Sequence, residues 1–99
     1  MATKEGTLKH GLKVGDTLHK HYVLRDATTA DLFDAEDEAS PSKRLQYRGA
    51  LIGRQLVKLG ELSGPIKLDL IRKLHPADFD ALVAAQAELE EAGKAEPAS

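Results

Sequence analysis

The chain changes its hydrophobic period once, and that change constrains its fold more than any other feature. Between Thr7 and Leu24, apolar residues alternate with polar ones on both sides of Gly15-Asp16, a dipeptide that is favoured in tight hairpin turns. After residue 28 the apolar residues follow helical spacing. This order predicts an α+β fold, with an N-terminal β-hairpin followed by three to four α-helices in a single small domain.

Capping and breaking residues set the expected boundaries. Thr28 and Asp31 have the spacing of a capping box at a helix start. Pro41 interrupts the helical pattern, Gly60 follows its next stretch, and Pro76 is suited to a first helical position. The predicted elements are the hairpin at 7–24 and helices at about 29–38, 43–59, 65–74 and 76–91, in a domain at 7–92 between a disordered N-terminus at 1–6 and a disordered tail at 93–99.

The hairpin register follows from which residues share a face. A two-residue loop at Gly15-Asp16 sets the even-numbered apolar positions of the first arm opposite odd-numbered positions of the second, which are mostly polar. An odd-length loop instead puts Leu8 beside Leu24, so that one face is consistently apolar. A three- or five-residue loop is therefore predicted.

Helical spacing also assigns the core. Apolar side chains three and four positions apart share one face of a helix, and that face is expected to point inward. The residues of these faces are Leu32, Phe33 and Ala35 in the first predicted helix, Leu45, Ile52, Leu56 and Leu59 in the second, and Phe79, Leu82, Val83, Gln86 and Leu89 in the last.

Composition excludes several classes of function. The chain has 99 residues and no Cys, which excludes disulfides, thiolate zinc sites and a cysteine nucleophile. No apolar run approaches the ~18 residues of a spanning helix, and the N-terminus lacks a signal-peptide core, so a cytoplasmic protein without a membrane partner is expected. The sequence contains no phosphate-binding loop or nucleophile elbow. Neither enzymatic activity nor a cofactor is predicted.

Histidines are the first candidates for a metal site. His10, His19 and His21 can approach one metal ion only in the register of the two-residue loop, because His10 faces the other way in the predicted register. No fourth ligand is placed to complete such a site. No metal site is predicted, and His75 is expected to cap the helix that begins at Pro76.

The charge is arranged in blocks. The formal net charge is −2, but residues 26–42 carry six acids and no base, while residues 43–60 carry five bases and no acid. Such blocks either neutralise each other within the fold or present a two-signed surface to a partner. The basic helix is compatible with a small DNA-binding regulator. The acids of the last helix oppose nucleic-acid binding, and no nucleic-acid partner is predicted.

Gly49-x-x-x-Gly53 lies inside the second predicted helix, where each glycine costs roughly 1 kcal/mol relative to alanine. The glycines permit close approach of another backbone, and two interpretations stay open. One is a helix contact within the chain, and the other is a groove for a partner helix. The candidate partner-binding residues are those of this helix that lie off its core stripe: Tyr47, Ala50, Leu51, Gly53, Arg54 and Val57.

The order of parts resembles the small tail assembly chaperones of long-tailed phages, in particular the Mu-like group, over about residues 7–92. Residues 22–32, YVLRDATTADL, are similar to the family's junction LR-x-P/A-T-x-x-D-L. Ala27 stands where the family often has proline, which implies a less rigid start of the helix. The other similar features are the Ala35-Glu36 step and the helix start Leu74-x-Pro76-x-Asp78-Phe79-x-x-Leu82.

The resemblance implies a non-enzymatic protein of the host cytoplasm that is absent from the mature virion. Such a chaperone binds the tape measure protein, keeps it soluble and helps recruit tail tube subunits. The implied partners are the tape measure protein, the tail tube protein and a frameshifted longer form of the chain itself, where one is made. A structural virion component is a further alternative, and the oligomeric state stays open.

Overall fold

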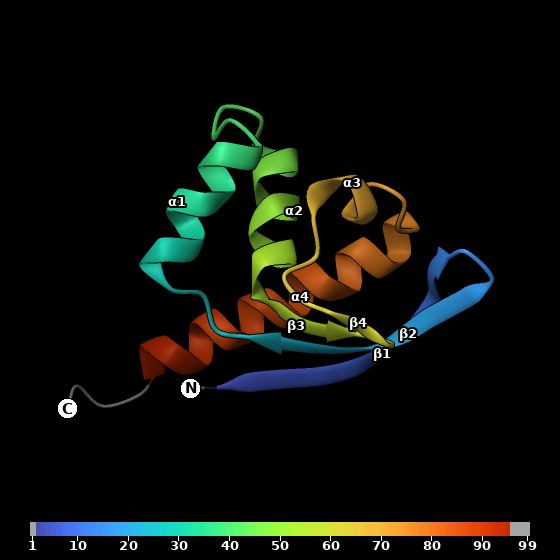
Figure 1. Ribbon diagram of the computed structural model, residues 1–99. Helices are drawn as coiled ribbons and strands as arrows, with labels where there is room; N and C mark the ends of the chain where they lie inside the picture. Colours follow the sequence, from blue (N-terminus) through green and yellow to red (C-terminus); the bar gives the residue numbers. More distant parts are fainter. Residues whose placement is uncertain (1, 96–99) are drawn as a thin grey trace.

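The computed structural model describes the backbone of residues 2–95 and the side chains of residues 2–93. It has a mixed α+β fold, with a four-stranded antiparallel sheet and helices, which confirms the predicted class (Figure 1). In chain order the elements are β1 (Thr3–Val14), β2 (Thr17–Arg25), α1 (Thr29–Glu38), α2 (Arg44–Gln55), β3 (Leu56–Leu59), β4 (Leu62–Ser63), α3 (Leu68–Ile71) and α4 (Pro76–Ala95).

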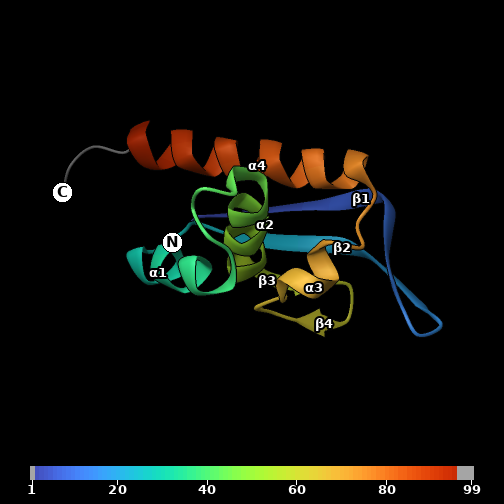
Figure 2. The same ribbon diagram turned by 90° about the horizontal axis from the view of Figure 1, so that it is seen from above.

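The helices gather on one face of the sheet, whose strand order is β1-β2-β3-β4 (Figures 1 and 2). α4 packs against β1 and β2, while α2 packs against β2 and β3. Antiparallel sheets commonly bury one face in this way. The core between the two layers contains the fully buried side chains of Leu8, Leu12, Leu24, Ile52, Leu56, Leu59 and Leu82.

The β1–β2 hairpin turns over two residues, Gly15 and Asp16, so the predicted odd-length loop is wrong. Next to the turn Leu12 pairs with His19, as a two-residue loop requires. Gly15 has a φ of 61°, a left-handed conformation that suits this tight turn. The prediction assumed that an extra residue in the turn brings the apolar residues of both strands to one face. In the structure, the pairing shifts further along β1 instead.

A bulge in β1 between Thr7 and Leu12 produces this shift. The pairing shifts there, because β1 has more residues than β2 between the two regular stretches. Both Leu8 and Leu12 face the helices, each with 1% of its surface exposed. One apolar face therefore forms despite the two-residue turn.

Asp78 at the start of α4 holds this bulge. Its carboxylate accepts backbone N–H groups of Lys9 (2.8 Å), His10 (3.1 Å) and Gly11 (2.8 Å), and the residue is 1% exposed. Successive N–H groups that converge in this way form an anion-binding concavity. Burial raises the pKa of Asp78, but these hydrogen bonds outweigh it and hold the pKa below the ordinary 3.8.

α1 spans the predicted range and begins with the predicted capping box between Thr28 and Asp31. Its buried residues are Asp31 and Ala35, whereas Leu32 is 40% and Phe33 65% exposed. The prediction that Leu32 and Phe33 point inward is therefore wrong. α1 packs beside α2 rather than on the sheet, so only a narrow strip of small residues is covered.

The second predicted helix, 43–59, is too long. α2 ends at Gln55, and Leu56–Leu59 forms β3, which pairs antiparallel with β2. As a strand, this segment hydrogen-bonds to β2 and still buries Leu56 and Leu59. Leu45, predicted to lie in the same core stripe, is 70% exposed, because it lies in the first turn of α2 and that end of the helix points away from the sheet (Figure 1).

α3 is shorter than the predicted helix at 65–74. It spans only Leu68–Ile71, because the chain before it is extended and the Ile66 N–H donates to the Gly53 carbonyl at 2.9 Å. α4 begins at Pro76, and the predicted cap is confirmed: His75 Nδ1 accepts the N–H of Ala77 at 3.0 Å.

Both ends of the described chain belong to regular elements. β1 already begins at Thr3 and α4 continues to Ala95, so the structure has a strand at 3–6 and helix at 93–95 in place of the predicted disorder. The strand start is paired, because Thr3 lies opposite Arg25. The rest of the predicted tails, residue 1 and residues 96–99, lies outside the described residues.

Candidate docking site

Three of the six predicted partner-binding residues, Ala50, Leu51 and Gly53, are buried. A methyl group added at Gly53 would overlap the carbonyl oxygen of Ile66, and one at Gly49 would lie within 3.6 Å of side chains from α3 and α4. The two glycines therefore admit segments of the same chain. Of the two interpretations of Gly49-x-x-x-Gly53, the structure shows the close contact within the chain.

The accessible predicted residues lie on two different hollows. Tyr47 lines one hollow, to which the mostly buried Leu51 also contributes, while Arg54 and Val57 line another. Tyr47 is half-buried, and its hydroxyl donates to the carbonyl of Leu32 at 3.3 Å. Val57 is 47% exposed on β3. The six residues thus do not form one continuous surface.

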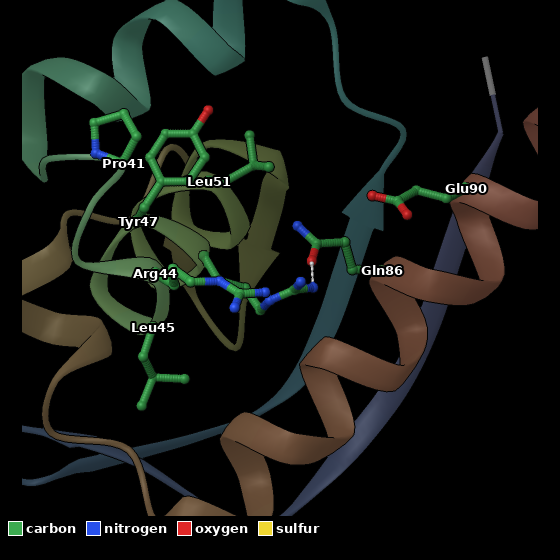
Figure 3. Close-up of a pocket in the computed structure, with 8 residues that line it drawn as sticks. Pro41, Arg44, Leu45, Tyr47, Leu51, Gln86 and Glu90 are labelled. Atoms are coloured by element: carbon green, nitrogen blue, oxygen red, sulfur yellow. Dashed lines mark hydrogen bonds between the residues drawn. The ribbon is translucent and has the colours of Figure 1, made fainter.

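The larger hollow, which we call the α2–α4 hollow, has a volume of about 490 Å³ (Figure 3). It lies between the first half of α2, the loop before it and the second half of α4. Figure 3 shows that side chains from both helices border it. They are Pro41, Arg44, Leu45, Tyr47, Arg48, Leu51, Gln86 and Glu90.

A chain of hydrogen bonds fixes one side of the α2–α4 hollow to the sheet. Arg48 Nη1 donates to Gln86 Oε1 at 3.1 Å (Figure 3), and Gln86 Nε2 donates to Gln55 Oε1 at 2.7 Å. Gln55 Nε2 then donates to the carbonyl of Arg25 at 2.9 Å. Gln55 and Gln86 are 1% and 2% exposed, so these bonds satisfy amides that burial would otherwise penalise.

Arg25 extends this polar chain to α1. Its guanidinium donates to both carboxylate oxygens of Asp31, at 2.6 and 2.8 Å. The hydrogen bond from Arg25 is the largest influence on the Asp31 carboxyl and lowers its pKa to about 2, although burial opposes this shift. The bidentate pair fixes α1 relative to β2. It thereby also positions the part of α1 that Tyr47 contacts through the carbonyl of Leu32.

Charged residues of both signs line the α2–α4 hollow. Arg44 and Arg48 lie in the first half of α2, whose first turn contains no acid, and the positive end of the helix dipole lies there too. Glu90 approaches from α4. With Leu45 and Tyr47 alongside, the hollow can hold the apolar side of a helix and attract acids that flank it.

A third hollow, the α2–α3 groove, lies on the other side of Leu45 from the α2–α4 hollow. It has a volume of about 270 Å³, and its lining is apolar except for Gln46 and Arg72. The side chains come from α2, α3, the segment between α3 and α4, and the first turn of α4. They are Leu45, Gln46, Leu68, Ile71, Arg72, Leu74, Pro76 and Phe79.

The histidines do not converge on one point. His19 is buried and its Nδ1 accepts a backbone N–H of the β3–β4 turn, whereas the ring of His10 stacks on that of His75 at 3.8 Å. Among the described residues, no group of three His, Asp or Glu side chains could hold a metal ion. Within residues 2–95, no helix is both long and apolar enough to cross a membrane.

The family described as tail assembly protein gp41 matches residues 8–98. The chain belongs to this family. A curated relative, the Mu-like prophage FluMu protein gp41 of Haemophilus influenzae, is 31% identical over a match of 87 residues. The match covers 76% of this chain and 68% of the relative. No solved structure matches the chain.

Membership of the gp41 tail assembly family confirms the resemblance to Mu-like tail assembly proteins. The matched range contains every residue that lines the α2–α4 hollow and the α2–α3 groove, so both surfaces belong to the family domain. The sequence prediction found Tyr47 and Leu51 but missed the facing residues Gln86 and Glu90 of α4. Their position depends on the packing of two helices that are distant in sequence. On α2, one local feature does indicate this surface: Arg44 and Arg48 lie in the first half of a helix whose first turn contains no acid.

Proposed function

We propose that this gp41-family chain is a tail assembly chaperone, which binds the tape measure protein, keeps it soluble and helps recruit tail tube subunits during tail morphogenesis. Membership of a tail assembly family supports the process. The proposal assigns the chain no catalytic role. It places the chain in the host cytoplasm and outside the finished virion.

The α2–α4 hollow is the observation that carries the proposal. A chaperone that hands on its client needs an accessible surface with many weak contacts rather than a deep specific pocket. The hollow combines apolar side chains such as Leu45 and Tyr47 with charges of both signs. An amphipathic helical segment of the tape measure protein fits this chemistry, with its apolar side against Leu45 and Tyr47 and its acids toward Arg44.

Co-expression with the tape measure protein tests the function. The wild-type chain should raise the soluble fraction of the tape measure protein, and Arg44→Glu should weaken binding about five- to tenfold, because it reverses a charge on the rim of the hollow. Lys58→Glu is the matched control: Lys58 is an exposed base on β3 and does not line the hollow. Both variants should fold, since neither side chain is buried.

Different outcomes separate the parts of the proposal. If the wild-type chain leaves the tape measure protein insoluble, the chaperone function is wrong. If Arg44→Glu behaves like Lys58→Glu, the function stands but the α2–α4 hollow is not the client site. Salt-dependent retardation of DNA would instead favour the DNA-binding alternative. Ala50→Glu is unsuitable for this test, because Ala50 is fully buried and a charge there would unfold the chain.

A further inference from the structure

The outer face of α1 is apolar at its centre and acidic around it. Phe33 is 65% exposed and lies opposite Asp31 and Ala35, the side of α1 that packs inward. Glu36 and Asp37 are three and four residues further on and therefore share the face of Phe33. Among the described residues neither acid takes part in an ion pair.

The α2–α3 groove has the complementary chemistry. Its volume of about 270 Å³ exceeds the roughly 150 Å³ of a cavity that binds benzene, so it can admit an aromatic side chain. Leu45 at its edge is 70% exposed. Arg72 is the one charged residue among the eight that line the groove, and it has no ion-pair partner within the described chain.

The two surfaces cannot meet within one chain. α1 packs against one side of α2, and α3 with the groove lies on the other side in both views (Figures 1 and 2). The opposite charge blocks at 26–42 and 43–60 are also largely unsatisfied internally. Between these two blocks the described side chains form a single ion pair, Arg54 with Glu38.

We propose that the outer face of α1 docks into the α2–α3 groove of a second copy of this chain. Phe33 enters the groove beside Leu45, and Glu36 and Asp37 face Arg72. Because the two surfaces differ and lie on opposite sides of α2, the contact is head-to-tail, and a bound pair leaves the groove free on one copy and the α1 face free on the other. The contact is small, so association is weak and decreases with added salt.

Sedimentation velocity over about 10 µM to 1 mM protein tests this contact, since weak interfaces associate in that range. The wild-type mass should rise above the 10.7 kDa of one chain as the concentration increases, and 0.5 M NaCl should shift it back. Phe33→Glu and the double variant Gln46→Glu/Arg72→Glu should each stay monomeric. Leu18→Glu is the matched control, because Leu18 is 51% exposed at the hairpin and belongs to neither surface. It should associate like the wild type.

An equimolar mixture of the two monomeric variants gives the sharper result. Each variant keeps the surface that the other has lost, so the mixture should form one-to-one pairs of twice the single-chain mass and nothing larger. The proposal is overturned if the wild type is monomeric at 1 mM, if either variant associates like the wild type, or if the mixture stays monomeric. A monomeric wild type whose groove variant fails to solubilise the tape measure protein would identify the client as the occupant instead.

Discussion

At the scale of single residues, Asp78 connects helix α4 to an irregularity in the sheet. Its carboxylate lies 2.8–3.3 Å from three successive backbone N–H groups of the β1 bulge. Those N–H groups have no strand partner on that side, and Gly11 among them has a φ of 82°. The bulge in turn allows a two-residue hairpin to keep one apolar face. One acid thus sets the register of the hairpin and the position of the helix upon it.

Asp78→Asn should lower the free energy of unfolding by about 2–3 kcal/mol, because an amide presents one acceptor and a donor to three N–H groups. Urea denaturation measures this difference. Asp80→Asn, an exposed acid two residues along α4, is the control and should change stability by less than about 0.5 kcal/mol. Equal effects of the two substitutions would show that the carboxylate does not hold the bulge.

The difference in the free energy of unfolding between the wild type and Asp78→Asn should depend on pH. The pKa of Asp78 is lower in the folded chain than its ordinary 3.8, so the folded state binds fewer protons than the unfolded state in the interval between the two values. The stabilisation by Asp78 is therefore complete above about pH 4 and is lost as the pH falls through the folded pKa. The stability difference between wild type and Asp78→Asn should shrink over that range.

At the scale of elements, the sequence predicted the boundaries that depend on residues adjacent in the chain. The capping residues Thr28 and Asp31 gave the start of α1, and Pro76 gave the start of α4. β3 was missed because Leu56 fits both a helical stripe and a strand, and only its pairing with β2 decides between them. The bulge was missed for a similar reason, because Asp78 is distant from it in sequence.

The candidate site shows the same division. Helical spacing correctly separated Tyr47 from the core, but it also assigned Ala50 and Gly53 to the surface. Gly53 is covered by the segment around Ile66 and α3, which follows α2 after a hairpin of two short strands. Ala50 instead packs in a cluster with Ala35 of α1 and with Ala39. Tertiary packing of this kind cannot be read from the period of one helix.

Gly53→Ala tests the close approach of α2 to the segment around Ile66. Alanine favours a helix over glycine by about 1 kcal/mol, but here its methyl group would overlap the Ile66 carbonyl oxygen. We expect a net loss of more than about 1 kcal/mol in the free energy of unfolding. Gly49→Ala is the matched control on the same helix, since its nearest contact is a flexible Leu68 side chain at 3.3 Å. It should be close to neutral or stabilising, and an equal loss at both positions would contradict the account.

At the scale of the whole molecule, a near-neutral chain carries the α2–α4 hollow, which is lined by apolar and charged side chains, the mainly apolar α2–α3 groove, and two opposed charge blocks. The blocks do not cancel inside the fold, because Asp34, Glu36 and Asp37 make no ion pair among the described side chains. The α2–α4 hollow is proposed for the client, and α1 with the α2–α3 groove for a second copy. Weak contacts at both surfaces suit a protein that must bind during tail assembly and then leave.

The most direct test of the chaperone account is to measure this chain by quantitative mass spectrometry in tail assembly intermediates and in finished virions. The account predicts that the chain accompanies the tape measure protein in the intermediates and is absent from the virions. A stoichiometric amount in finished virions would show that it is a structural component, and intermediates that contain the tape measure protein without this chain would contradict the account.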